Sequence, residues 1–164
     1  MINQSLSDLA QQVGDALKKH KLMLATAESC TGGGLSYWIT SISGSSDWFD
    51  RGFVTYSNPA KLQMLGVTAP TLTRSGAVSS EVAKEMAEGA LDHSDADVSI
   101  AVTGIAGPLG GTADKPVGTV WIAWAKRNTP TLAKQFVFQG DRHEVREQTV
   151  NKSLAGLLDY LHSR

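Results

Sequence analysis

The sequence predicts an α/β fold, a three-layer α/β/α sandwich around a mixed sheet of about five strands. Short apolar runs, typical of buried strands, alternate along the chain with longer segments whose apolar residues recur at helical spacing. Two β-rich runs near the carboxyl end are joined by a short polar segment, which indicates an antiparallel hairpin. The 164 residues fit one compact domain, 1–164, without a linker or an internal repeat.

In the first part of the chain, helices and strands are expected to alternate. An apolar stripe at helical spacing predicts the first helix, and the mostly apolar run after it is typical of a strand buried on both faces. A glycine-serine segment then ends the second helix. The expected elements are a helix at 5–20, a strand at 22–27, a helix at 34–42 and a strand at 53–56.

A short helix is predicted directly after the second strand. Asn58 is a suitable N-cap, and Pro59 is a suitable first helical residue because the first turn leaves its N–H groups unpaired in any case. Gly66 is expected to end this helix. Lys61 therefore lies in its first turn.

The second half of the chain predicts a helix, a buried strand, the hairpin and a last helix. The stretch 105–116 is too long for a simple connection, and long loops in compact domains are usually functional. Asp141 and Glu144 have the spacing of a capping box. The expected elements are a helix from near Ser79, strands at 98–102, 119–125 and 132–138, and a helix from Asp141.

The composition excludes several classes of function. The 15 Lys and Arg against 16 Asp and Glu give no sign of a surface for nucleic acid or for an anionic membrane. A single cysteine excludes an intramolecular disulfide, and the four histidines are not spaced as metal ligands. The amino terminus is typical of a polar amphipathic helix rather than a signal peptide, and no apolar run approaches the roughly 20 residues that span a bilayer. We therefore expect a cytoplasmic protein without a metal or other cofactor.

The first apolar strand ends at a hydroxyl and a thiol, Ser29 and Cys30. Glycines follow directly, and they let a ligand approach the backbone closely, while the first turn of the next helix presents N–H groups suited to an anion or oxyanion. The alternative is a plain N-cap followed by a glycine-rich turn. On the functional interpretation, the substrate would contact Cys30, Thr31, Gly32 and Gly33.

Three polar side chains are expected at the carboxyl ends of strands: Ser29, Tyr56 and Thr103, the last followed by Gly104. In open α/β sheets, ligands bind beyond this edge. One pocket can therefore contain all of them.

Ser29 needs a base before it can act as a nucleophile, and Lys61 is the best candidate. An ammonium in the first turn of a helix opposes the helix dipole, which lowers its pKa, and a desolvated lysine can serve as a general base. The alternative is an exposed surface lysine.

Tyr56 could pass protons or bind substrate, or it could be an ordinary strand aromatic. Cys30 could replace Ser29 as nucleophile, although a buried small side chain is the simpler interpretation.

Arg142 and Arg146 lie four residues apart at the amino end of the last helix, so they share one face. The helix dipole favours anions at this end, and the pair suggests a clamp for a phosphate or a carboxylate. The alternative is that both are solvated and pair with Glu144, Glu147 or other neighbours.

The combined motifs closely resemble the CinA C-terminal-type family, the nicotinamide-nucleotide amidases, some of whose members are named competence- or damage-inducible proteins. The resemblance covers nearly the whole chain. It rests on Ala27-Glu28-Ser29-Cys30-Thr31-Gly32-Gly33, Val54-Thr55-Tyr56-Ser57-Asn58 with Lys61, Gly76-Ala77-Val78-Ser79, Val102-Thr103-Gly104-Ile105-Ala106-Gly107-Pro108 and Gly140-Asp141-Arg142.

The resemblance implies hydrolysis of nicotinamide mononucleotide to nicotinic acid mononucleotide and ammonia. It also implies a Ser–Lys site at Ser29 and Lys61 with Tyr56 nearby, and a homo-oligomer, commonly a dimer. Some members carry a further N-terminal domain, and this chain resembles the stand-alone form. One departure is Leu109, where the family's loop usually continues with glycine, so the loop geometry and the fit of the substrate are expected to differ.

We therefore expect an amidohydrolase in which Lys61 activates Ser29 and backbone N–H groups after Ser29 stabilise the oxyanion. Arg142, with Arg146 and the turn at Thr103 and Gly104, would hold the 5′-phosphate. Two alternatives stay open at this stage. One is a nucleotide sensor of the same fold without activity, and the other is an amidase for a different small amide.

Overall fold

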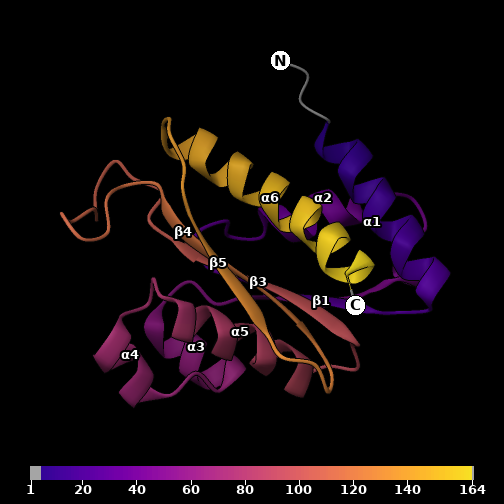
Figure 1. Cartoon of the computed structure of the whole chain (residues 1–164), viewed down its shortest axis with the longest axis horizontal. Coiled ribbons are helices and arrows are strands. Elements are labelled where there is room, and N and C mark those ends of the chain that lie inside the picture. Colours follow the sequence, from indigo (N-terminus) through magenta and orange to yellow (C-terminus); the bar gives the residue numbers. More distant parts are fainter. Residues whose placement is uncertain (1–4, 164) are drawn as a thin grey trace.

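The structure is a computed structural model that describes residues 5–163. Within that range five strands form one sheet in the order β2-β1-β3-β4-β5. Figure 1 labels β1, β3, β4 and β5 of this sheet. The strands are β1 (Leu24–Glu28), β2 (Phe49–Val54), β3 (Val98–Gly104), β4 (Thr119–Lys126) and β5 (Leu132–Val137). β1 is parallel to both of its neighbours, and β4 is antiparallel to β3 and β5. The prediction of a mixed sheet is confirmed.

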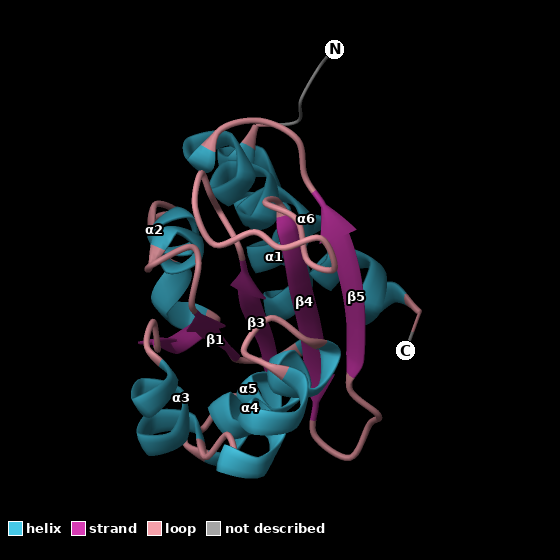
Figure 2. Ribbon diagram, turned by 90° about the vertical axis from the view of Figure 1, so that its left-hand side faces the viewer, coloured by secondary structure: helices cyan, strands magenta, loops and turns pink. Residues whose placement is uncertain are grey.

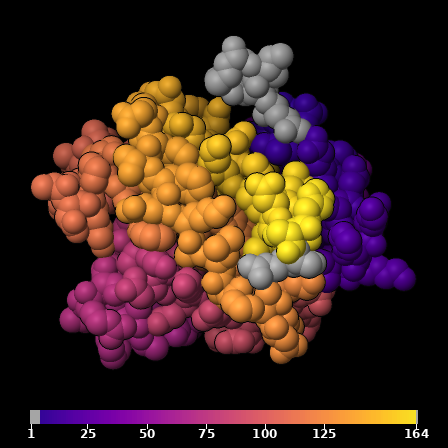
Figure 3. Space-filling model, in the orientation of Figure 1, coloured from indigo at the N-terminus to yellow at the C-terminus, as the bar shows by residue number. Residues whose placement is uncertain are grey.

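Helices cover both faces of this sheet and give the expected three layers (Figure 2). One face carries α1 (Leu6–His20), α2 (Gly34–Thr40) and α6 (Arg142–His162). The other face carries α3 (Asn58–Leu65), α4 (Ala69–Ser75) and α5 (Ser80–Asp92). A short 3₁₀ helix, η1 (Ser45–Asp47), precedes β2. The carboxyl-terminal turns of α6 lie beside α1 on the molecular surface (Figure 3).

Two apolar clusters form the core, one on each face of the sheet. In β3, Ile100 and Val102 belong to the cluster beneath α1, α2 and α6, whereas Ala101 belongs to the cluster with α5. The strands thus present mostly alanine to α5, which lets this helix pack closely on the sheet. Ser99 in β3 donates its hydroxyl to the carbonyl of Ala87 in α5, 2.7 Å away.

The second strand and the helix after it differ from the expectation. β2 runs from Phe49 to Val54 instead of 53–56, so Tyr56 follows the strand and is not part of it. β2 is an edge strand with half of its residues exposed, and it therefore lacks the apolar pattern that predicts a strand. The N-cap of α3 is Ser57, which accepts from the N–H of Ala60, and Asn58 is the first helical residue. Lys61 is still in the first turn, as predicted.

The remaining elements agree closely with the sequence, with one addition. The helix α4 was not expected, and Thr68 caps it through the N–H of Thr71. The capping box is confirmed, because Asp141 and Glu144 each accept the other's backbone N–H at 2.9 Å. The loop after β3 extends away from the sheet, and Leu109 within it is 85% exposed.

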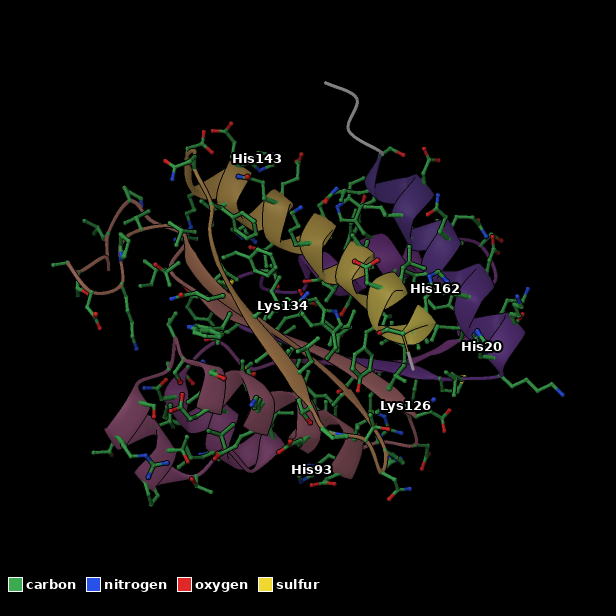
Figure 4. All side chains as sticks on the ribbon, in the orientation of Figure 1. His20, His93, Lys126, Lys134, His143 and His162 are labelled. Atoms are coloured by element: carbon green, nitrogen blue, oxygen red, sulfur yellow. The ribbon has the colours of Figure 1, made fainter. Side chains whose placement is uncertain are left out.

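Within residues 5–163 no helix is long and apolar enough to span a membrane. The same residues contain no group of three or more His, Cys, Asp or Glu side chains arranged to hold a metal ion. Figure 4 labels the four histidines, which lie at or near helix ends: His20, His93, His143 and His162.

Trp48 connects α1 to the start of β2, and its side chain is only 2% exposed. It packs against α1 at Gly14, where an added Cβ would lie 2.6 Å from the indole. A glycine inside a helix usually costs about 1 kcal/mol relative to alanine. At this position the contact with Trp48 outweighs that preference.

We predict that Gly14→Ala lowers the free energy of unfolding by about 1–3 kcal/mol, because the indole must move within a filled core. Gln12→Ala, an exposed site of the same helix, is the control and should change stability by less than about 0.5 kcal/mol. Urea denaturation measures both variants. A Gly14→Ala protein that is more stable than the wild type would contradict the close packing of Trp48 on α1.

Candidate active site

A cavity of about 240 Å³ opens at the carboxyl edge of the parallel strands. Its walls come from the segments that follow β1 and β2, from α3, from the end of β3 and from the start of α6. The lining residues are Ser29, Cys30, Tyr56, Asn58, Lys61, Ala77, Val78, Thr103, Gly104, Ala106 and Arg142. The predicted meeting of Ser29, Tyr56 and Thr103 in one pocket is confirmed.

A wider groove of about 380 Å³ lies between α3 and α4, but none of its lining residues is titratable. The groove therefore offers no acid, base or charged group for chemistry. The smaller cavity, by contrast, contains a hydroxyl, an amine and a guanidinium. We treat it as the candidate active site.

Ser29 and Lys61 are in direct contact at the base of this cavity. Lys61 Nζ donates to Ser29 Oγ at 3.1 Å. Both residues are buried: Lys61 is 1% exposed and Ser29 is 7% exposed. Ser29 follows the last residue of β1 and Lys61 lies in the first turn of α3, so strand and helix bring the pair together across 32 residues of sequence.

The surroundings of Lys61 make its amine easier to deprotonate than that of an exposed lysine. Its Nζ also donates to the carbonyls of Thr55 and Tyr56, at 3.1 and 3.0 Å. Within residues 5–163 no carboxylate forms an ion pair with it. Burial lowers the pKa of Lys61 below its ordinary value, because desolvation penalises the charged form. The alternative of an exposed surface lysine is wrong.

The two carbonyls match the hydrogen-bonding needs of a neutral amine. Such an amine has two N–H donors, which the oxygens of Thr55 and Tyr56 accept, and one lone pair. In the hydrogen bonds described above, the third N–H of the protonated amine donates to Ser29 Oγ; once that proton is lost and both carbonyls stay bound, the lone pair would face the same oxygen. The geometry therefore suits transfer of the serine proton to Lys61.

Tyr56 contributes its main chain and its side chain to different parts of the site. Its carbonyl binds Lys61 and lies 3.5 Å from Ser29 Oγ. Its side chain is exposed, and the phenol oxygen accepts from Arg142 Nη2 at 3.4 Å. The phenol thus lies with Arg142 at the cavity wall and forms no hydrogen bond with Ser29 or Lys61 in the described structure.

Cys30 lines the cavity, but its thiol is expected to be unreactive. Burial raises the pKa of its thiol to about 12, and the nearby charge of Glu28 adds to that rise. The thiolate is the nucleophilic form, so very little of it exists near neutral pH. This favours Ser29 over Cys30 as the nucleophile.

The amino end of α2 differs from the expectation, because its N–H groups are already occupied. The side chain of Glu28 accepts from the N–H groups of Gly33, Leu35 and Ser36. An anion from a ligand therefore has no free site at these groups. The sequence indicated the anion site but not that this chain fills it with its own carboxylate.

The N–H groups nearest to Ser29 remain available. The N–H groups of Cys30 and Thr31 donate to no other residue within 5–163, whereas the N–H of Ser29 donates to Val102. Gly32 and Gly33 have φ values of 56° and 103°, which glycine adopts readily, and they turn the chain without lining the cavity. The hydroxyl of Thr31 points to Glu28 instead of the cavity.

The two arginines of α6 do not act together. Arg142 lines the cavity and donates to the carbonyl of Gly107 at 2.7 Å. Arg146 donates to the carbonyls of Cys30 and Thr31, both at 3.1 Å, and is absent from the cavity lining. The interpretation of both as one clamp is corrected here, because the turn after Ser29 takes up the guanidinium of Arg146.

Several lining residues were not identified as site residues from the sequence. Asn58 was expected as a cap and as part of a family motif, and Ala77 and Val78 only as part of a family motif. Thr103 donates its hydroxyl to the carbonyl of Ala77, 2.9 Å away, and so fixes that wall. Gly104 is required by close packing, because a Cβ there would lie 2.6 Å from the Val120 side chain. Apolar wall residues carry no chemical signal in the sequence.

Fold and site together define an α/β domain with a buried serine–lysine pair at the carboxyl edge of its parallel strands. The comparisons with known proteins agree with this class. The family model described as the CinA C-terminal domain matches residues 6–161. The chain belongs to that family.

Named relatives are similar over almost their whole length. Nicotinamide-nucleotide amidohydrolase PncC of Escherichia coli strain K12 is 50% identical over 157 residues, 96% of this chain and 95% of that protein. The protein of the same name from Pseudomonas putida is 46% identical over 153 residues, 93% of this chain and 95% of that protein. The crystal structure of competence/damage inducible protein CihA from Agrobacterium tumefaciens has a TM-score of 0.93 at 45% identity, covering 99% of this chain and 98% of that one.

Proposed function

We propose that this chain is a nicotinamide-nucleotide amidohydrolase, which converts nicotinamide mononucleotide and water to nicotinic acid mononucleotide and ammonia. The names of relatives about half identical over nearly the full chain support the reaction. The observation that supports this chain's own chemistry best is the contact of 3.1 Å between Lys61 Nζ and Ser29 Oγ in a buried site.

In the first half of the proposed reaction, neutral Lys61 takes the proton of Ser29, and the alkoxide attacks the carboxamide carbon. The tetrahedral intermediate collapses when the Lys61 ammonium gives its proton to the leaving nitrogen, which departs as ammonia. The nicotinoyl group is then an ester of Ser29. In the second half, Lys61 takes a proton from water, the hydroxide attacks the ester, and the proton returns to Ser29 as the acid leaves.

The negative charge on the carbonyl oxygen needs hydrogen-bond donors in the tetrahedral intermediate. We assign this role to the N–H groups of Cys30 and Thr31, since neither donates to another of the residues 5–163 and both directly follow the nucleophile. The substrate contact of Cys30 is therefore through its backbone. Gly32 and Gly33 act through the shape of the turn.

The 5′-phosphate is assigned to Arg142, with the phenol of Tyr56 beside it. Arg142 is the cation on the cavity wall, and a guanidinium binds phosphate oxygens through several N–H donors. Thr103 and Gly104 also line the cavity. The buried, uncharged surroundings of Ser29 suit the amide, while the charge of Arg142 suits the phosphate.

The proposal extends to the domain organisation, the oligomeric state and the location of the protein. We propose that residues 1–164 act as one domain, that the protein functions as a dimer and that it works in the cytoplasm. A nucleotide sensor without activity would have no use for an amine desolvated against a serine hydroxyl, so the Ser29–Lys61 contact favours an enzyme.

We predict that Ser29→Ala lowers the rate of ammonia release from nicotinamide mononucleotide by at least about 10³-fold, because the nucleophile is lost. Substrate binding should remain, since no packing contact is removed. Cys30→Ala is the matched control and should keep most of the activity. Ammonia release by each protein decides the assignment: an active Ser29→Ala with an inactive Cys30→Ala would make the cysteine the nucleophile.

We predict that kcat/KM of the wild type rises with pH and levels off below the ordinary pKa of lysine, 10.5, because the base must be neutral and burial lowers its pKa. Lys61→Arg should be as inactive as Lys61→Ala, since a guanidinium cannot release its proton at working pH. The pH profile of kcat/KM for the three proteins provides the test. A Lys61→Arg enzyme with normal activity would show that only the positive charge is needed.

We predict that Arg142→Ala weakens transition-state binding of the mononucleotide by about 1.5–3 kcal/mol, the range of a hydrogen bond to a charged group. This corresponds to a loss of about 10- to 150-fold in kcat/KM. The riboside without phosphate is the matched control substrate and should be affected much less. An equal loss on both substrates would remove Arg142 from the phosphate site.

A further inference from the structure

Glu28, the last residue of β1, has a fully buried carboxyl group that the reaction above does not use. Its two oxygens accept five hydrogen bonds, as an ionised carboxylate does. The donors are the hydroxyl of Thr31, the N–H groups of Gly33, Leu35 and Ser36, and the hydroxyl of Ser36, at 2.5, 3.2, 2.8, 2.9 and 2.7 Å respectively.

All five hydrogen bonds hold the segment that follows the nucleophile. Ser29 lies between Glu28 and the first of these donors, so residues 29–33 form a turn whose far side is tied to the carboxylate. From the outside, Arg146 donates to the carbonyls of Cys30 and Thr31. The turn that carries Ser29 is thus fixed between a buried carboxylate and a guanidinium.

Glu28 also ties the nucleophile to the base. Its main-chain carbonyl accepts from the N–H of Thr55 at 2.8 Å, and the carbonyl of Thr55 accepts from Lys61 Nζ. The side chain of Glu28 therefore orients the turn with Ser29, while its backbone orients the strand end that holds Lys61. One residue lies at the junction of both halves of the pair.

The space around the carboxylate leaves it no alternative position. The hydroxyl of Ser36 bonds both to Glu28 and to Thr26, 2.8 Å away. Gly52 of the neighbouring strand closes the network, since a Cβ there would lie 2.5 Å from Ser36 Oγ and 2.7 Å from Thr26 Oγ1. Because these polar side chains fill the space and all form hydrogen bonds, they adopt a single arrangement.

We propose that Glu28 is the positioning residue of the active site. It holds Ser29 within reach of Lys61 and fixes the turn that contains the N–H groups of Cys30 and Thr31. This inference rests on the proposed function for its kinetic consequence, and on the hydrogen bonds of Glu28 alone for its structural one. Glu28 itself touches no substrate.

Glutamine in place of Glu28 cannot make the same bonds. In one orientation of the glutamine amide, its oxygen accepts from Gly33 and Leu35, but its nitrogen then faces the N–H of Ser36. When the amide is turned the other way round, its nitrogen faces the N–H groups of Gly33 and Leu35 instead. Two donors then face each other in a buried site, and the turn must move. Misplacement of a reacting group by about 1 Å is enough to lower a rate about 100-fold.

The experiment compares Glu28→Gln with the wild type in ammonia release from nicotinamide mononucleotide. We expect kcat to fall about 100-fold and KM to stay within about threefold, because the wall with Arg142 is unchanged. Thr31→Val, which keeps the shape of the side chain and removes one bond to Glu28, should lower kcat about tenfold with an unchanged KM. A rise in KM instead would make Thr31 a substrate contact and overturn the assignment.

The matched control is Asp97→Asn. Asp97 is a partly buried carboxylate that accepts the N–H of Met23 at the opposite, amino end of β1. Removal of its charge should lower stability but leave kcat as in the wild type. A similar fall in kcat for Asp97→Asn and Glu28→Gln would show that loss of stability alone explains the effect, and would overturn the proposal.

Crystal structures of the wild type, Glu28→Gln and Thr31→Val separate this proposal from the proposed function. In both variants we expect Ser29 Oγ to move out of hydrogen-bond distance of Lys61 Nζ. If the wild type releases no ammonia, the proposed function fails, but this distance still decides the role of Glu28. If Glu28→Gln does not fold, Thr31→Val decides it. An unchanged Ser29–Lys61 contact in the variant that folds overturns the proposal.

Discussion

The amine of Lys61, buried without a paired carboxylate among residues 5–163, is the constraint on which the rest of the site depends. A buried ammonium is costly in free energy unless it is paired with a charge, and the hydrogen-bond partners of this amine within residues 5–163 are two carbonyls and one hydroxyl. Desolvation therefore makes the proton of this amine easier to remove than that of an exposed lysine. A lowered pKa is what the proposed role of Lys61 as the base for Ser29 requires.

The fold supplies this environment through the parallel half of the sheet. β1 and β2 are parallel neighbours and end side by side, so the residues that follow them lie together beyond the carboxyl edge of the sheet. The strand end at Thr55 and Tyr56 provides the carbonyls, and α3 starts immediately afterwards and returns Lys61 to them. On the opposite side α6 reaches over the same edge and places Arg142 on the wall. The Ser29–Lys61 pair and Arg142 therefore have separate structural origins.

The sequence predicted the fold class, the mixed sheet and the positions of Ser29 and Lys61, because these follow from local patterns. An apolar strand before Ser29 and capping residues before Lys61 are visible in a short window of sequence. β2 was misplaced, since an exposed edge strand such as Phe49–Val54 lacks apolar alternation. The short helix α4 carries too few residues for a clear periodicity.

The sequence could not predict how polar side chains share partners across the fold. Arg142 and Arg146 look equivalent in sequence, yet one lines the cavity and the other holds the turn after Ser29. Glu28 carried one usable signal, an acidic residue at the end of an apolar strand next to a glycine-rich turn. Its partners are known only once α2 is in place, because three of them are backbone N–H groups.

The most direct test of the Ser29–Lys61 account is the mass of the enzyme during turnover. A reaction with nicotinamide mononucleotide is stopped with acid within the first turnover, digested and analysed by mass spectrometry. The account predicts that the peptide containing Ser29 carries the nicotinoyl nucleotide as an ester on the serine, with ammonia already released. The same adduct on Cys30, or product formed in that first turnover without any adduct on the peptide, would contradict it.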